Sequence, residues 1–262
     1  MRRGTSFWGV ILIIVGGLLL LNNLGIFNVD IWGAMWSLIL IAFGFWLLIG
    51  VVGRGDGSPR KALSIPLDGA SQVKVMVRHG AGRLSIRGGA NEDVALSGNF
   101  DGGVEERTYK SGDALEVNLD AARSIFGIFP FAQGNFWSIS LNEQTPISLD
   151  VRAGANETTI DLRAVKITDL VLKTGASSTE LTLPAMAGFT RAKVESGVAA
   201  VRVRVPDGVA ASIRATGGLA EIKVDSSRFP HSGDRYQSAD YDSAENRVEL
   251  DLTMGVGSLD VR

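Results

Sequence analysis

The chain contains no cysteine, and this absence excludes disulfide bonds, thiolate metal ligands and a cysteine nucleophile. Histidine is scarce as well, because His79 and His231 are the only two and lie far apart in the sequence. Lysine and arginine never form a run longer than two residues, and the formal net charge is -2. We therefore expect neither a two-histidine metal site nor a basic nucleic-acid-binding patch.

Charge is nearly absent from the first part of the chain, where Asp30 is the only charged residue between Gly4 and Gly53. Two apolar runs fill this segment, at residues 7–27 and 31–52. A helix needs roughly 20 apolar residues to cross the hydrocarbon core of a bilayer. The sequence therefore predicts two transmembrane helices that form a hairpin.

This predicted hairpin takes up residues 1–53, and its flanking charges predict its orientation. A cleaved signal peptide over residues 1–24 is the alternative, but no small-x-small cleavage site follows and a second apolar run comes directly after. The loop between the two runs contains no lysine or arginine. The cations lie outside the runs, before the first and after the second: Arg2, Arg3, Arg54, Arg60 and Lys61. The positive-inside rule then places both termini, and the domain that follows, in the cytoplasm.

The rest of the chain repeats one short pattern six times after a Gly-, Ser- and Pro-containing linker at residues 54–62. Each copy has alternating apolar residues on both sides of a key glycine. These glycines are Gly80, Gly154, Gly175, Gly197, Gly218 and Gly255. The four middle ones are 21, 22 and 21 residues apart, and a fixed period near 20 residues is typical of stacked repeats. We therefore predict an all-β fold over residues 63–262, a β-solenoid with rungs of about 21 residues.

In most repeats, the residues five and three before the glycine, and one, four and six after it, are apolar or small. The alternation shifts by one residue after the glycine, which predicts a bulge or bend that keeps both halves facing one core. Glycine suits such a bend because it tolerates a positive φ. We expect the residue directly after each glycine to point inward.

An insertion at about residues 88–147 interrupts the repeats. Residues 94–96 and 115–119 have strand character and predict a hairpin around residues 101–103. A turn-rich aromatic segment follows, in which five side chains are candidate contacts: Phe126, Phe129, Phe131, Phe136 and Trp137. This segment either caps the end of the solenoid or exposes an apolar patch to a partner or the bilayer. Residues 226–246 are polar and predict a surface loop.

The sequence gives little support for catalytic activity. Some repeat folds cleave polysaccharides, and such enzymes need carboxylates gathered at one place. Here the acidic residues are spread over outward strand positions among lysines and arginines: Asp150, Asp161, Asp169, Glu180, Glu195, Glu221 and Asp225. We predict no catalytic residue, no metal site and no cofactor, and therefore a protein that is not an enzyme.

Two regions resemble a known bacterial family. Residues 7–27, together with Trp36-Ser-Leu-Ile-Leu-Ile-Ala-Phe-Gly44, are similar to the LiaI/LiaF-type transmembrane region. The segments at residues 174–184 and 195–206 resemble the toast-rack β-solenoid of LiaF-like proteins. The resemblance implies a bacterial inner-membrane location. It also implies regulation of a cell-envelope-stress two-component system through its membrane sensor kinase, and it supplies no catalytic residues.

Three functional hypotheses follow. The first is a regulator or scaffold in envelope-stress sensing, with the bilayer and a sensor kinase or other membrane protein as partners. The second is a self-assembling structural protein, in which the last strand, residues 257–262, offers an uncovered edge for a homo-oligomer. The third and most remote is a carbohydrate-active enzyme, which would require the β domain outside the cytoplasm.

Overall fold

The computed structural model describes residues 36, 40–41, 61–121 and 135–262, and these divide between two compact units, Met1–Asp56 and Gly57–Arg262. In the first unit, the described residues Trp36, Leu40 and Ile41 are helical. The predicted spans otherwise lie outside the described residues. None of the helical residues that the structure describes belongs to a helix with the length and hydrophobicity to cross a bilayer.

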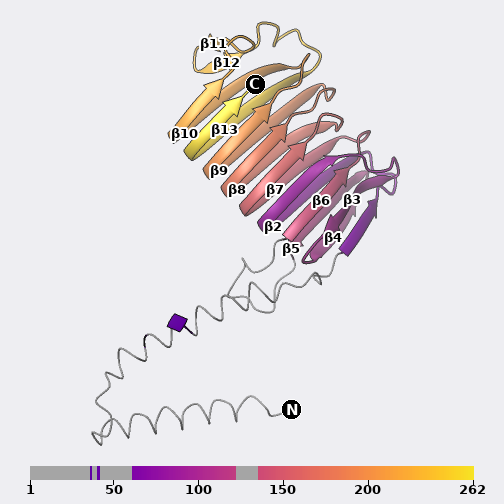
Figure 1. The fold of residues 1–262 in the computed structure, drawn as a ribbon. Helices are drawn as coiled ribbons and strands as arrows, with labels where there is room; N and C mark the ends of the chain where they lie inside the picture. The colour runs from indigo at the N-terminus through magenta and orange to yellow at the C-terminus, as the bar shows by residue number, and fades with distance from the viewer. Residues whose placement is uncertain (1–35, 37–39, 42–60, 122–134) are drawn as a thin grey trace, which may run out of the picture. The chain divides into compact units, whose positions relative to one another are not determined.

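The second unit is built from β-strands that form one 13-stranded sheet (Figure 1). The strands are β1 (Lys61–Pro66), β2 (Gln72–Gly88), β3 (Val94–Phe100), β4 (Val104–Ser111), β5 (Ala114–Ala121), β6 (Asn135–Leu141), β7 (Ile147–Asp161), β8 (Ile167–Thr182), β9 (Phe189–Arg204), β10 (Ala210–Val224), β11 (His231–Ser232), β12 (Arg235–Gln237) and β13 (Arg247–Val261). The six long strands β2, β7, β8, β9, β13 and β10 are the six repeats. The predicted all-β domain is confirmed.

The long strands lie parallel and side by side in the order β2-β7-β8-β9-β13-β10 (Figure 1). Their register follows the repeat, since Ala155 pairs with Ala81 on one side and with Ala176 on the other. The last repeat does not lie at the end of the stack. β13 is inserted between β9 and β10, so the expectation that residues 257–262 form an uncovered edge is wrong.

The key glycines are stacked on one another, which explains why each repeat has one. A Cβ added to Gly154 would lie 2.5 Å from the carbonyl oxygen of Gly80, and one added to Gly175 would lie 3.1 Å from that of Gly154. The same close approach recurs along the stack at Gly197, Gly255 and Gly218. None of the six key glycines has a positive φ, so that part of the expectation is wrong. Glycine is required because neighbouring backbones leave no room for a side chain.

The alternation of buried residues shifts at the glycine itself. In β8, the even-numbered residues Leu170, Leu172 and Thr174 are buried before Gly175. After the glycine, the odd-numbered positions turn inward: Ser177 is half-buried and Leu181 is fully buried. The glycine and the residue after it are both exposed. The expectation that the residue after the glycine points inward is therefore wrong. Two consecutive exposed residues turn the strand, and the two halves of each long strand bury side chains in one shared core.

The insertion splits the sheet into two branches at β2. The first half of β2 pairs with β5, which pairs with β4, whereas the second half pairs with β6, followed by β3 and β1. β3 and β5 thus belong to different branches, and the predicted hairpin between them is wrong. Each branch instead extends one half of the repeating sheet.

Asn142, directly after β6, holds the start of the insertion to its end. Its side chain is fully buried, and its Nδ2 donates to the carbonyl oxygens of Asn91, Glu92 and Val94 at 3.2, 3.1 and 2.9 Å. Its Oδ1 accepts from the backbone N–H groups of Gln144 and Thr145, both at 2.9 Å. One side chain therefore makes hydrogen bonds with five backbone groups and connects residues 91–94 to residues 144–145.

Residues 225–246 pack against the β10 end of the stack rather than forming only a surface loop. Phe229 is 1% exposed, and the Arg228 guanidinium lies 4.9 Å from its ring centroid and donates to the carbonyl oxygen of Val205 at 2.8 Å. β12 pairs with β10 at Ser212 and Ile213 only. This segment covers the first half of β10 and leaves the second half uncovered by any strand that the structure describes.

Candidate functional site

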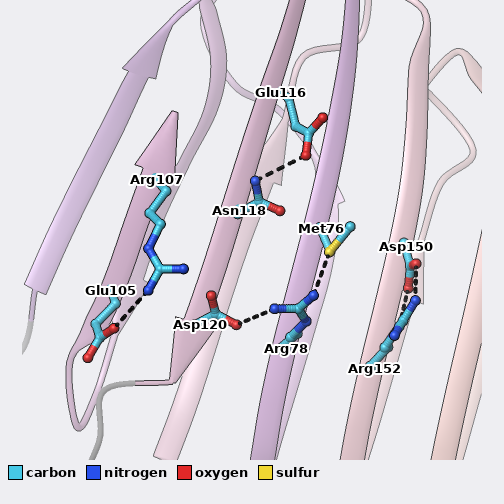
Figure 2. Close-up of polar contacts among 9 residues, drawn as sticks. All are labelled: Met76, Arg78, Glu105, Arg107, Glu116, Asn118, Asp120, Asp150 and Arg152. Atoms are coloured by element: carbon cyan, nitrogen blue, oxygen red, sulfur yellow. Dashed lines mark hydrogen bonds and ion pairs between the residues drawn. The ribbon is translucent and has the colours of Figure 1, made fainter. Parts of the chain in front are cut away.

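An open groove of about 650 Å3 lies over the outer side of the bend, where strands of both the insertion and the repeats meet. It is lined by Arg78, His79 and Gly80 of β2, Glu105 and Arg107 of β4, Asp120 and Ala121 of β5, Arg152, Ala153 and Gly154 of β7, and Lys173, Thr174 and Gly175 of β8. Figure 2 shows how its charged side chains lie across β4, β5, β2 and β7. The groove is thus a product of stacking, since no single repeat contains it.

Three cations stand side by side in the groove, because the position two residues before the key glycine is basic in three adjacent strands. Arg78 pairs in register with Arg152, and Arg152 with Lys173. Like charges directly opposite each other destabilise a sheet. Each of the three cations is balanced by a carboxylate.

Arg78 reaches Asp120 on β5 at 3.3 Å, and Arg152 reaches Asp150 on its own strand at 3.0 Å (Figure 2). Across the groove, Arg107 pairs with Glu105 on β4 at 3.6 Å. The hydrogen bonds and charge of Asp150 raise the pKa of Arg152. Exposed pairs of this kind contribute little to stability, because water and salt screen them. Their effect here is to neutralise a row of like charges.

Lys173 belongs to a small ion-pair network on the neighbouring strand. Its Nζ lies 2.7 Å from a Glu195 carboxylate oxygen, and Lys193 lies 2.7 Å from the other oxygen. Hydrogen bonds from Lys173 and Lys193 lower the pKa of Glu195 from 4.5 to about 2. Glu195 is consequently ionised at neutral pH, as a structural ion pair requires, rather than poised to exchange a proton.

A row of side chains lies along the bend, and we call it the corner row; all of its members except the half-buried Ala81 are exposed. It consists of the residue after each key glycine, in stack order Ala81, Ala155, Ala176, Val198, Val256 and Leu219. The row becomes larger and more apolar toward β10, where Val198, Val256 and Leu219 are 62%, 44% and 81% exposed. Exposed apolar side chains that adjoin in register form a continuous patch, which is typical of a contact surface.

The corner row was missed by the sequence argument because apolar residues in a strand pattern are assigned to the core. The size of its side chains gave no signal either, because buried rows vary as much. Ala192 is 1% exposed although it lies in register between the buried Leu170 and Leu250 of the neighbouring strands.

The predicted aromatic contacts differ in their exposure to solvent. Phe126, Phe129 and Phe131 lie outside the described residues. Phe136 is 39% exposed and stays a candidate contact. The prediction for Trp137 is corrected, because this residue is fully buried and its ring meets Phe100 edge-on, with centroids 5.0 Å apart. Trp137 therefore fills the core where the two branches diverge.

No group of three or more histidine, cysteine, aspartate or glutamate side chains suited to a metal ion occurs among the residues that the structure describes. Of the seven carboxylates singled out from the sequence, six lie in ion pairs, whereas Asp225 accepts hydrogen bonds from the backbone and hydroxyl of Ser227. Asp161 pairs with Arg163, Asp169 with Arg191, and Glu180 with Arg202. What the described surface offers is a long, charge-balanced sheet with an apolar corner row.

The stack of parallel strands, the stacked key glycines and the apolar N-terminal region together define a membrane-anchored all-β protein. Comparison with family models is consistent with this class. Residues 54–204 match the N-terminal domain of toast_rack (DUF2154), which is more than half of the chain, and residues 6–48 match the LiaI-LiaF-like transmembrane region. The chain belongs to the toast_rack family, and it is anchored in the membrane through its LiaI-LiaF-like region.

One solved structure supports the fold of the β domain. A candidate cell adhesion protein from Clostridium sporogenes superposes with a TM-score of 0.70 at 21% identity, over 78% of this chain and 98% of that one. A candidate adhesin from Bacteroides fragilis gives a TM-score of 0.26 at 9% identity, over 79% of this chain and 98% of that one. Comparison with curated proteins gives no significant match. The first likeness establishes that the β domain has a known fold.

Proposed function

We propose that this chain is a non-catalytic regulator or scaffold in bacterial cell-envelope stress sensing, which acts by contacting a membrane protein such as a sensor kinase. The observation that carries the proposal is the union, in one chain, of a LiaI-LiaF-like transmembrane region and a β domain whose most distinctive exposed feature is the corner row. A membrane anchor confines the domain to the surface where such a partner is found.

The electrostatics of the described surface favour a binding role. The groove's cations are each paired, so the groove does not present a free row of positive charge to a small anion. The corner row, by contrast, leaves apolar area in water at Val198, Val256 and Leu219. Covering that area with a partner is favourable by about 25 cal/mol per Å2 of apolar surface.

Co-purification and a stress reporter test this proposal together. The full-length protein is recovered in mild detergent from resting and stressed cells, and the output of an envelope-stress reporter is compared with that of a deletion strain. We expect a sensor kinase to co-purify and the deletion to change reporter output. Unchanged output in both states, with no kinase recovered, would contradict the proposal.

Val198→Asp is the informative variant, because Val198 is exposed and a carboxylate there should spare the fold while weakening an apolar contact. Glu180→Gln, on the outward face of the same sheet, is the matched control. We expect V198D to behave like the deletion and E180Q like the wild type. Equal behaviour of the two variants would remove the corner row from the proposal.

We propose further that both termini and the β domain are cytoplasmic, as the flanking cations indicate. A reporter fused after Arg262 tests this placement. A signal from outside the membrane would contradict it, and would put the domain in the compartment that adhesion, the role named for the Clostridium sporogenes protein, requires.

A further inference from the structure

The end of the stack at β10 has an open edge. β13 covers one side of β10 along its whole length, from Ala210 to Val224. On the other side, among the residues that the structure describes, β12 pairs only with Ser212 and Ile213. The second half of β10, residues 218–224, therefore presents one complete row of backbone groups to solvent. An edge of this kind is a template for another strand.

The core is open at the same place. Ala220, Ile222 and Val224 occupy the repeat positions that point inward, yet all three are only half-buried. In β13, directly beside them, the residues in register with Ile222 and Val224 are Leu259 and Val261, which are 2% and 0% exposed. The apolar side chains of β10 lack the neighbour that each other long strand has, and an added strand would supply it.

The direction of the backbone groups defines which residues can pair. Asp225 donates its N–H to the carbonyl oxygen of Val261 in β13. Successive residues of a strand direct their N–H and C=O groups to opposite sides, so the odd-numbered residues face β13. Ala220, Ile222 and Val224 then direct their N–H and C=O groups to the open side. These are also the residues whose side chains are half-buried.

We propose that this edge binds a second copy of the chain, in antiparallel orientation, about a two-fold axis at Ile222. Ile222 then exchanges hydrogen bonds with Ile222 of the second copy, and Ala220 does so with the second copy's Val224. The two inner faces join on the same side of the extended sheet, so the half-buried side chains of both copies become neighbours. Pairing through the same patch on both copies closes the assembly as a dimer.

Charge complementarity selects this occupant and this register. With the axis at Ile222, Glu221 lies directly opposite Lys223 of the second copy, and Lys223 lies opposite the second copy's Glu221. In the single chain these two side chains pair with each other at 2.9 Å and are 66% and 69% exposed, so they are free to exchange partners. An axis one residue away in either direction would place like charges opposite each other. The dimer is independent of the membrane partner proposed above.

Cysteine crosslinking of the full-length protein in membranes tests the dimer, and the natural absence of cysteine gives a clean background. Two differently tagged variants, Glu221→Cys and Lys223→Cys, are expressed together and oxidised. Opposite residues in a non-hydrogen-bonded pair have Cα atoms about 4.5 Å apart, within the range of a disulfide. Identical residues on the two copies lie two positions out of register, at roughly 7–8 Å. We expect the mixed E221C–K223C dimer to exceed either same-residue dimer several-fold.

Two controls make the result decisive. The pair Glu180→Cys and Arg202→Cys lies on the same outward face, but β8 and β9 are covered on both sides by neighbouring strands, so it should give no dimer. Glu221→Lys alone should lower the dimer yield of a separate chemical crosslinker, and the double variant E221K/K223E should restore it. Equal yields for mixed and same-residue cysteine pairs, a disulfide to a different protein only, or no rescue by the double variant would each overturn the proposal.

Discussion

Replacing the key glycines by alanine gives a direct test of the backbone stack. In Gly154→Ala the added methyl carbon would lie 2.5 Å from the carbonyl oxygen of Gly80, well inside ordinary contact. Gly80 occupies the same repeat position at the end of the row of stacked key glycines, and a Cβ there meets nothing within 4 Å. The two substitutions are chemically identical and differ only in whether a neighbouring backbone stands in the way.

The two variants should shift stability in opposite directions. An alanine that fits its site stabilises a protein by about 0.4–1 kcal/mol, because it restricts the unfolded chain. An added group that does not fit costs typically about 1–3 kcal/mol. We therefore expect G80A to be neutral or stabilised by up to ~1 kcal/mol, and G154A to lose about 1–2 kcal/mol. For a domain of this size, each kcal/mol corresponds to roughly 2–4 °C in Tm.

Thermal unfolding of the full-length protein in detergent, followed by β-sheet circular dichroism, measures the difference. Gly175→Ala, whose Cβ would lie 3.1 Å from the Gly154 oxygen, should fall between the other two. Equal Tm values for G80A and G154A would refute the reasoning, because the loss would then not depend on the stacked carbonyl. If both variants lost the same stability, the bend would need glycine for its conformation.

Three further outcomes are expected. Trp137→Ala should lower stability by about 3–5 kcal/mol in thermal unfolding, because it empties a fully buried site, whereas Phe136→Ala next to it should change little. Asn142→Ala should lower the urea midpoint by the equivalent of at least about 2 kcal/mol, since two backbone N–H groups and three carbonyl oxygens each lose a hydrogen bond. The folded-state pKa of Glu195 is about 2, below its ordinary 4.5, so its contribution is present above pH 4.5 and is lost as the pH falls toward 2. Glu195→Gln should therefore flatten the pH dependence of the urea midpoint in that window, and an unchanged slope would contradict the ion-pair network.

The repeat and its glycines were predictable because they are local features. Side chains alternate along a strand with a period of two, so the apolar pattern around Gly175 indicates strands whatever their neighbours are. The fixed spacing of the key glycines likewise indicates one glycine per repeat. The bend could also be placed near each glycine, because the alternation shifts there.

The side-chain directions at the bend were not predictable in full. An apolar residue after each glycine suits either face of a strand that is turning, and its apolar character alone favours the core. The structure places Val198 and Leu219 in solvent and puts Thr174 and Ser196 inside, where their hydroxyl oxygens lie 2.9 Å apart. In a sequence, threonine and serine indicate positions that face solvent. Here they are buried, because each hydroxyl group forms a hydrogen bond with a hydroxyl group in the next strand.

The candidate contact surfaces depend on strand order, which the pattern does not encode. Trp137 looked like part of an aromatic patch because it follows several phenylalanines, but its strand, β6, joins the branch that buries it. In the same way, the open edge belongs to β10, although β13 comes last in the chain.

By itself, the sequence determined an apolar N-terminal region, an all-β domain built on a repeat of about 21 residues, and one glycine in each repeat, because these depend on local alternation and spacing. Only the tertiary structure decided why the glycines are needed, which strand lies at the edge and which apolar residues face water. All six repeats carry the same pattern, so any of them is locally suited to any place in the stack. Long-range backbone pairing selects the order, and that order creates both the glycine contacts and the open edge of β10.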